Sequence, residues 1–532
     1  MATGSPLFVL TFVLTFFSHG FGSFYESQGL SDYMPGYIYI LRGIEAIRSL
    51  LGLAYDGIAA TVLYKIPAMA FDMAIAYMLY KISRKHFDIC NSMLITSMFI
   101  FNPVVILNSA VWGQIDSILT FALMLMCYLV YKNNLRFAYI VFGLGCLIKP
   151  QMFVFTPVLL FAFIENIFVH KDKNGKVSFK FMVDNLFMQG TYAVISIAVT
   201  LLLCMPFGLG NVIKQCFDTM GSYEYASVNA YNFWAMLGLD WAPQDDYLFF
   251  LTYKQWGYLC IILLVVVSLI IWIDKINDRS RYLIIAAFLG IGMFTFSVRM
   301  HERYIYPAIM VLLLLFIVIK KANVFWMYLV FSIINFYNSA HVLFYYDPYN
   351  FDSRGPVIIL SGLASTIAFT FLIIFIKKYY LGNRKLKGKY SDLLVKTPSK
   401  REYDKRVTVE VSEKVPKMTS KDWLIAIVIS VLYGVIAFYN LGDRNVPESS
   451  CYIDSEESVV FKFDKDTQIS KMEYYLGNYE EREFDVFASD DGENWINLGN
   501  LTMESVFRWD SYKIDTATSY IRLSLISCIQ RC

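Results

Sequence analysis

Long apolar runs separated by short polar loops fill most of this chain. Many runs approach the roughly 20 residues that an α-helix needs to cross a bilayer, and their repetition predicts a polytopic α-helical membrane protein. We count about twelve spans, at residues 61–80, 93–109, 117–131, 136–148, 151–168, 186–208, 256–275, 281–297, 304–319, 324–344, 357–376 and 422–441.

The loops between these runs are of two kinds. Basic loops are typical of the cytoplasmic side, and we place there residues 81–85, 132–136, 171–176, 274–281 and 320–321. The second kind gathers acids, amides and aromatics, at residues 31–37, 112–116, 149–151, 229–234 and 299–304. Threading the runs alternately leaves the two kinds on opposite sides, which predicts a site on the non-cytoplasmic face.

Three segments depart from this pattern: residues 7–17, the basic stretch 377–421 and residues 446–532. Residues 7–17 are apolar but short, with no basic residue before them, and fit either a signal-peptide core or a helix at the outer interface. Residues 446–532 alternate in the manner of strands and predict a small outer β-domain. The expected parts are a transmembrane domain at 1–376, a basic cytoplasmic linker at 377–421, a final span at 422–441 and the β-domain at 446–532.

Composition supports the membrane class and excludes several chemistries. Charged residues make up 17% of the chain, against about 25% in soluble domains. The net charge of +2 argues against a nucleic-acid partner. The nine cysteines include no CxxC pair, which argues against a zinc or iron–sulfur site. Nucleotide-binding glycine loops and the GxSxG motif of serine hydrolases are also missing from the sequence.

Several acids are candidates for chemistry, each with a plainer alternative. Asp116 is either an acid lining a substrate recess or a hydrogen-bond anchor for the preceding turn. Asp32 and Glu26 are either a general base or solvated loop acids. Asp72 lies within an apolar run, and we expect it to be a helix-packing partner, with Lys65 as a candidate pair.

Cations accompany these acids in the second kind of loop. Arg299, His301, Glu302 and Arg303 form either a phosphate-binding group or an interfacial salt-bridge cluster. Lys149 ends an apolar run before a proline and is either a phosphate ligand or a lysine that reaches for the membrane surface.

Together, four of these motifs resemble those of the GT-C glycosyltransferases. In this sequence they read Ser31–Tyr39, Asn108–Asp116, Ile148–Gln151 and Arg299–Pro307. The chain is similar in particular to bacterial mannosyltransferase-like proteins related to the enzyme that adds the second mannose of GPI anchors. Glucosyltransferases that use dolichyl-phosphate-glucose are more distant. The likeness spans roughly residues 24–345.

This resemblance implies an inverting transfer from a polyprenyl-phosphate sugar on the outer face. Three groups of site residues are then expected. The catalytic group is Asp32, Asp116 and Glu302; the donor-phosphate group is His301, Arg303, Arg299 and Lys149; the pocket-lining group is Tyr33, Tyr37, Trp112, Gln114, Gln151, Asn229, Asn232 and Trp234. No metal or other cofactor is required, although Asp116 with a second acid could hold a divalent ion.

One position departs from the family pattern. The family's base is an acid about 25 residues before the Asp-Tyr-Pro-Pro stretch, which falls here near residues 5–8, where no acid stands. Met34 also replaces the first proline of that stretch. An inactive, glycan-binding relative is therefore one alternative, and a lipid-linked sugar transporter is another.

The C-terminal segment resembles a discoidin (F5/8 type C) module. Ala488–Trp495 and Tyr520–Leu523 carry this likeness. It implies a jelly-roll β-sandwich, shortened here, in which Cys451 and Cys528 could form a closing disulfide.

The expected function is transfer of a hexose, mannose rather than glucose, to a glycan or glycolipid at the outer face of a bacterial plasma membrane. The expected partners are the lipid bilayer, the polyprenyl-phosphate sugar and that acceptor.

Overall fold

The structure, a computed structural model of the 532-residue chain, separates into two compact units. Met1–Tyr55 and Ala59–Tyr439 form a helical unit; Asp56–Ile58 and Asn440–Cys532 form a unit that contains a β-sheet. The residues described are 21–22, 24–25, 33–53, 58–169, 179–275, 278–345, 352–381, 418–438, 458–475, 480–503 and 509–530. Asp32, Glu26, Cys451, residues 7–17 and most of the predicted linker lie outside them.

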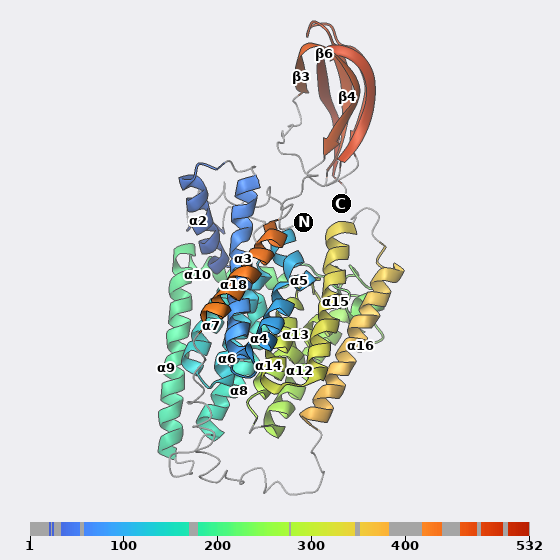
Figure 1. The fold of residues 1–532 in the computed structure, drawn as a ribbon. Helices are drawn as coiled ribbons and strands as arrows, with labels where there is room; N and C mark the ends of the chain where they lie inside the picture. The colour runs from blue at the N-terminus through green and yellow to red at the C-terminus, as the bar shows by residue number, and fades with distance from the viewer. Residues whose placement is uncertain are drawn as a thin grey trace. The chain divides into compact units, whose positions relative to one another are not determined.

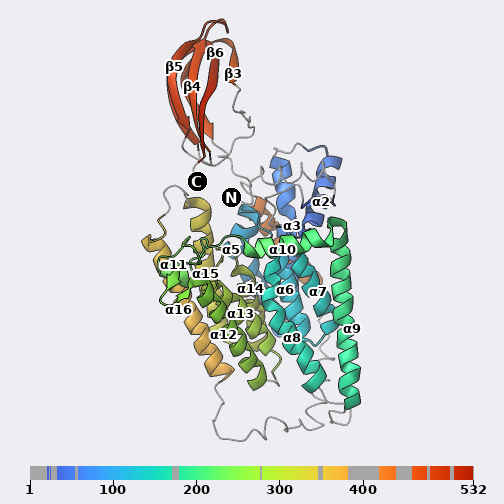
Figure 2. The same cartoon turned by 180° about the vertical axis from the view of Figure 1, so that it is seen from behind.

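All twelve predicted spans correspond to helices (Figures 1 and 2). The helical elements are α2 (Pro35–Leu50), α3 (Ile58–Ser83), α4 (Ile89–Ile100), α5 (Pro103–Ile106), η1 (Leu107–Val111), α6 (Asp116–Tyr131), α7 (Leu135–Ile148), η2 (Pro150–Phe155), α8 (Thr156–Ile164), η3 (Glu165–Val169), α9 (Phe179–Cys204), η4 (Met205–Phe207), α10 (Leu209–Gly221), α11 (Phe233–Met236), α12 (Tyr253–Asp274), α13 (Arg281–Phe296), α14 (Tyr306–Ile319), α15 (Ala322–Tyr345), α16 (Pro356–Tyr379) and α18 (Ser420–Phe438).

Among the described residues, seven helical stretches are long and apolar enough to cross a membrane. The pair α4 and α5–η1, bent by 44°, adds an eighth if it counts as one span. The predicted run 93–109 is this bent pair, because Asn102 and Pro103 interrupt the helix and Asn102 caps the new start. The chain is therefore an integral, polytopic membrane protein.

Four helices are too short to span on their own. Helices α6, α7, α13 and α14 have 14 to 16 residues, or about 21–24 Å at 1.5 Å per residue, against a hydrocarbon core of about 30 Å. Nearly all side chains of α13 and α14 are buried, so these helices form the centre of the unit. Because they are short, polar residues at their ends are held inside the protein.

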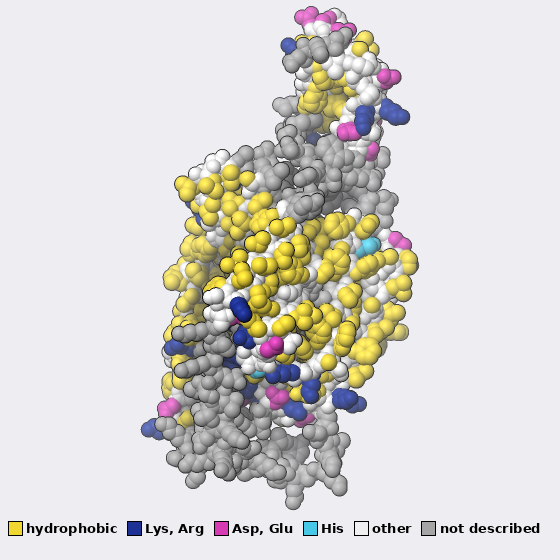
Figure 3. Space-filling model, viewed as in Figure 1, with side chains coloured by type: hydrophobic (Ala, Val, Ile, Leu, Met, Phe, Trp, Pro, Cys, Tyr) yellow, Lys and Arg dark blue, Asp and Glu magenta, His cyan; other side chains and the backbone are white. Residues whose placement is uncertain are grey.

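The basic loops that the structure describes converge at one end of the helical unit. Lys85 donates to the Tyr128 hydroxyl at 3.1 Å, and the Lys320 ammonium lies 5.2 Å from the centre of the Phe87 ring. Figure 3 shows Lys and Arg gathered below the apolar flank of the helices. We call this the basic end. Contacts among the second kind of loop, described below, define the opposite end.

The buried Asp72 does not pair with Lys65, and that prediction is wrong. Its carboxylate accepts from Ser117 Oγ at 2.5 Å and from the Tyr433 hydroxyl at 3.0 Å. Lys65 instead donates to the Val111 carbonyl at 2.8 Å, beside Gly113. Asp72 therefore packs α3 against α6 and α18 through hydroxyl donors, the helix-packing role that was predicted for it.

The second unit contains a four-stranded antiparallel sheet in the order β3-β6-β4-β5. The strands are β3 (Ser458–Tyr475), β4 (Glu480–Ser489), β5 (Ile496–Met503) and β6 (Trp509–Gln530). Alternate residues such as Phe484, Val486 and Leu523 bury one face. A β-domain was predicted correctly, but the described residues form one sheet, and the second sheet of a jelly roll is not among them.

Candidate functional site

Two loops, residues 222–252 and 297–305, pair to form the floor of the candidate site. The Val228 amide donates to the Met300 carbonyl at 2.9 Å, and Val228 and Asn229 both bridge to His301. Asn229 and Arg299 have positive φ angles of 59° and 64°, which side-chain-bearing residues rarely adopt. Such backbone costs about 1–3 kcal/mol at each position and collects at functional sites.

Four ionisable side chains meet beside these loops, and we call them the acid–base cluster. Lys149 Nζ lies 2.5 Å from Asp116 Oδ1, and Arg303 Nε lies 3.7 Å from Asp116 Oδ2. Arg303 Nη1 lies 2.6 Å from Glu302 Oε1. The residues begin α6, end α7 and precede α14, so the short central helices bring them together. Asp116 is fully buried.

Aromatic rings and amides surround this cluster. The Arg303 guanidinium lies 5.8 Å from the ring centres of both Trp112 and Tyr304. Gln151 Nε2 donates to the Tyr304 carbonyl at 2.6 Å, and Asn335 donates to the Glu302 carbonyl at 2.7 Å. These contacts fix the loop that carries the cations.

The surroundings of His301 favour the neutral form of its imidazole. Burial lowers the pKa of its imidazole well below the usual value, and the positive charges of Arg303 and Lys149 lower it further. Its ring packs edge-on against Tyr223, with 4.6 Å between ring centres. The expectation of a cationic His301 therefore needs correction, and a neutral imidazole can donate or accept a hydrogen bond.

Several buried polar atoms of this region lack a hydrogen-bond partner in the described part of the chain. In the acid–base cluster they are Asp116 Oδ2 and Arg303 Nε, which face each other at 3.7 Å as an ion pair without a hydrogen bond. Around it they are Trp112 Nε1, Gln151 Oε1 and Asn335 Oδ1. Buried polar groups are normally satisfied, and each exception requires an explanation. Here the exceptions gather at one place, where a polar ligand would satisfy them.

Some of the predicted site residues serve other purposes. The Arg299 guanidinium turns away from the cluster and binds Gln244 Oε1, the Met220 carbonyl and Glu224 Oε1 at 2.9, 2.8 and 3.3 Å. Asn232 caps α11 and donates to the Phe294 carbonyl at 2.9 Å. Trp234 donates to the Phe296 carbonyl at 3.0 Å, so both residues anchor α11 to α13.

The remaining predicted residues lie around the same end of the unit. The rings of Tyr33 and Tyr37 pack with 4.7 Å between their centres. Gln114 is buried, and its backbone N–H donates to the Asn108 carbonyl at 2.8 Å. Asn229 is held by Trp241 and Asn338, while Asp32 lies outside the described residues.

Sequence reasoning missed Asp240 and a second charged cluster. Asp240 is buried and accepts from the Asn229 amide at 3.0 Å. No motif marks it in the sequence. A metal centre has no support among the residues described, which contain no group of three or more His, Cys, Asp or Glu side chains that could hold an ion.

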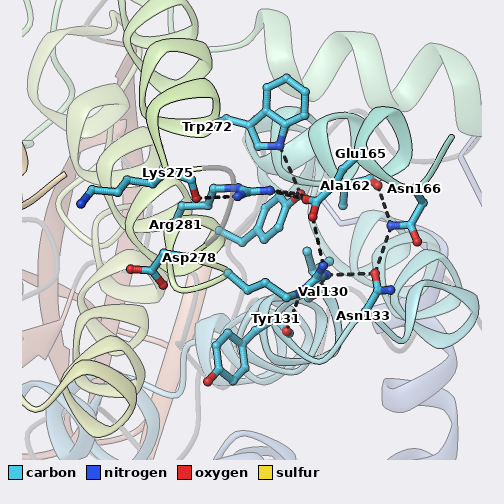
Figure 4. Close-up of polar contacts among 12 residues, drawn as sticks. Val130, Tyr131, Asn133, Ala162, Glu165, Asn166, Trp272, Lys275, Asp278 and Arg281 are labelled. Carbon is cyan, nitrogen blue, oxygen red and sulfur yellow. Dashed lines mark hydrogen bonds and ion pairs between the residues drawn. The ribbon is translucent and has the colours of Figure 1, made fainter. Parts of the chain in front are cut away.

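The second charged cluster lies at the basic end (Figure 4). Glu165 forms ion pairs with Arg279, at 3.3 Å, and with Arg281, and it also accepts from the Tyr282 hydroxyl. We call these four residues the brace. Arg279 also donates to the Val130 and Tyr131 carbonyls and to Asn133 Oδ1, so the brace joins the α6–α7 turn, η3 and the start of α13.

Comparison with known proteins adds no assignment. No protein-family model matches this chain, and no curated protein sequence matches it.

Proposed function

We propose that this protein is a membrane-embedded glycosyltransferase that takes a hexose, mannose rather than glucose, from a polyprenyl-phosphate donor. One observation carries the proposal. Lys149 and Arg303, two largely enclosed cations, lie at the ends of short central helices beside polar atoms that have no hydrogen-bond partner within the described residues. Guanidinium and ammonium groups bind phosphate through charge-assisted hydrogen bonds.

The chemistry of such a transfer suits this arrangement. When the bond from the sugar to the phosphate breaks, charge develops on the polyprenyl phosphate. Lys149 and Arg303 are already oriented and would stabilise that charge without reorganising. Asp116 keeps both cations in place before the donor arrives, and Glu302 holds Arg303 from the other side.

A transporter of lipid-linked sugars is the competing proposal, and it needs access from both ends of the unit. The brace argues against it. Glu165 and Arg281 are buried, and together with the half-buried Arg279 they tie several helices together at the basic end. Opening that end would separate buried opposite charges, which costs several kcal/mol.

Donor turnover tests the proposal. The full chain, in lipid nanodiscs, would receive polyprenyl-phosphate mannose or glucose, and mass spectrometry would measure released polyprenyl phosphate. Arg303→Lys keeps the charge but loses the planar fork, so release should fall about 100-fold. Arg299→Lys is the matched control, because this arginine lies in the same loop and faces away from the cluster.

The outcomes separate the candidate functions. Release that Arg303→Lys lowers about 100-fold and Arg299→Lys leaves intact would support the enzyme. Movement of intact donor between leaflets without release would support the transporter. Binding of a glycan by the β-unit alone, with neither release nor movement, would support an inactive relative.

A further inference from the structure

We propose that Asp240 is the general base that takes the proton from the acceptor hydroxyl. The inference rests on the proposed function, since it names the residue that would activate the acceptor of that transfer. It also supplies a base within the described residues, where the acid of the first outer loop is absent from its expected position.

Asp240 belongs to the floor of the site. Ser227 bridges to Asp240, and the neighbouring Val228 and Asn229 bridge to His301. The segment 227–229 therefore lies between the backbones of Asp240 and His301, and adjacent paired segments are about 4.8 Å apart. The base is thus placed beside the loop that carries Arg303.

The Asp240 carboxylate is held at one oxygen and unpartnered at the other. Oδ1 accepts from the Asn229 amide at 3.0 Å, which fixes the orientation of the group. Oδ2 is buried and finds no hydrogen-bond partner among the residues described, and the side chain is only 3% exposed. A carboxyl oxygen in this state is available to a hydroxyl that enters the site.

The other two carboxylates of the site are engaged with cations. Asp116 pairs with Lys149 and Arg303, and Glu302 pairs with Arg303. Asp240 makes no ion pair within the described residues. A carboxylate without a cation keeps its basicity, whereas a paired carboxylate loses it.

The titration of Asp240 fits this role. Burial and, to a smaller extent, the Glu302 carboxylate raise its pKa to about 7, against the Asn229 amide and the nearby polar groups of Ser227 and Trp241, which lower it. A base works best when its pKa lies near the working pH. Asp240 would be half ionised at neutral pH and would become a better base as the pH rises.

The step balances as a single displacement. The acceptor hydroxyl loses its proton to Asp240 Oδ2, and its oxygen forms a bond to the anomeric carbon. The bond between that carbon and the phosphate oxygen breaks, and the electron pair leaves on the polyprenyl phosphate beside Lys149 and Arg303. The proton later passes from Asp240 to water.

The test is the pH dependence of release in Asp240→Asn. Full-length wild type, Asp240→Asn, Asp240→Glu and Arg303→Lys would be assayed in nanodiscs with polyprenyl-phosphate mannose and octyl mannoside, from pH 5.5 to about 8.5, a range that brackets the Asp240 pKa of about 7. The asparagine keeps the Oδ1 acceptor for the Asn229 amide, so the loop should stay folded. Donor affinity would be measured separately, from the thermal shift that the donor produces.

We expect Asp240→Asn to bind donor as wild type does and to lose about 10²–10⁴-fold in release. The wild-type rate should rise about tenfold per pH unit below pH 7 and level off above it, a limb that disappears in Asp240→Asn. Asp240→Glu should retain part of the activity, while Arg303→Lys should lose donor affinity.

Two different failures are distinguishable. Release by Asp240→Asn within threefold of wild type (~0.65 kcal/mol), or an unchanged pH limb, would overturn the assignment of Asp240 and leave the enzyme intact. A wild type that neither binds nor cleaves mannose or glucose donors would overturn the proposed function, and the base with it.

Discussion

The acid–base cluster and the brace are built from the same residue types and differ in completeness. Both bury carboxylates against arginines at helix ends. In the brace, Arg281 Nε is the one buried polar side-chain atom that has no hydrogen-bond partner among the described residues. In and around the acid–base cluster there are several, including Asp116 Oδ2 and Trp112 Nε1.

This difference separates a structural element from a site. A satisfied network of buried charges rigidifies a fold, whereas an unsatisfied one costs free energy that a ligand or an ordered water can recover. The brace joins backbone carbonyls of the α6–α7 turn to η3 and α13 and has little left to bind. The acid–base cluster keeps donors and acceptors that make no hydrogen bond. We therefore infer that the cluster binds the ligand and that the brace holds the basic end of the helical unit closed.

The largest predicted effect is on the brace. Glu165→Ala leaves the buried Arg281 and the half-buried Arg279 without this counter-charge, and breaking a buried pair such as Glu165–Arg281 costs about 3–5 kcal/mol. Thermal unfolding in mild detergent would measure the loss, with Glu224→Ala as the control, because Glu224 pairs with Arg299 at an exposed position. Equal losses in both variants would contradict the assignment of the brace.

The sequence predicted the acid–base cluster but not the brace, and there is a physical reason for this difference. Apolar runs predicted the helices because lipid leaves few alternatives to a helix. Lys149, Asp116 and Arg303 were grouped because alternating spans place their loops on one side. Glu165 and Arg281 are 116 residues apart in the sequence. In the sequence alone, the charged residues of the basic end look like ordinary solvated loop residues. Asp240 follows no motif, and only the pairing of two loops reveals it.

The next effect concerns Lys149. Lys149→Met removes one of the two cations proposed to bind the donor phosphate. It should lower kcat/KM for the donor about 100-fold, a loss of about 2.7 kcal/mol in transition-state stabilisation. It also leaves Asp116 with Arg303 alone, so stability should fall. Adding Asp116→Asn removes the uncompensated charge.

The double variant sharpens the comparison between ligand binding and stability. Unfolding temperatures should recover in Lys149→Met with Asp116→Asn, whereas donor turnover should stay low. Recovery of turnover together with stability would mean that the pair is structural, like the brace.

A smaller effect is expected from anions alone. If the acid–base cluster binds phosphate, an isoprenyl phosphate at about ten times its Kd should raise the unfolding free energy by about 1.4 kcal/mol. The pKa of His301, which Arg303 and Lys149 lower, should rise when the anion screens those charges. Imidazole resonances with and without ligand would report it, and Glu165→Gln should leave the response unchanged.

The smallest effect tests Trp112, whose ring covers Arg303 and whose Nε1 is one of the partnerless atoms. Trp112→Phe keeps an aromatic face but removes the N–H donor. If this nitrogen only packs against the cluster, its loss relieves an unsatisfied buried group, and stability should stay constant or rise slightly. If a bound donor accepts from Nε1, donor affinity should weaken by about 0.5–1.5 kcal/mol while the free protein unfolds as before.

Thermal unfolding with and without donor distinguishes the two cases. Trp272→Phe, at the brace, is the control, because the opposite result is expected there. Trp272 Nε1 donates to the Tyr282 hydroxyl at 3.2 Å, so there the same substitution should reduce stability and leave donor affinity unchanged. A ligand-dependent loss in Trp112→Phe and a ligand-independent loss in Trp272→Phe would place the two clusters in different classes on one measurement.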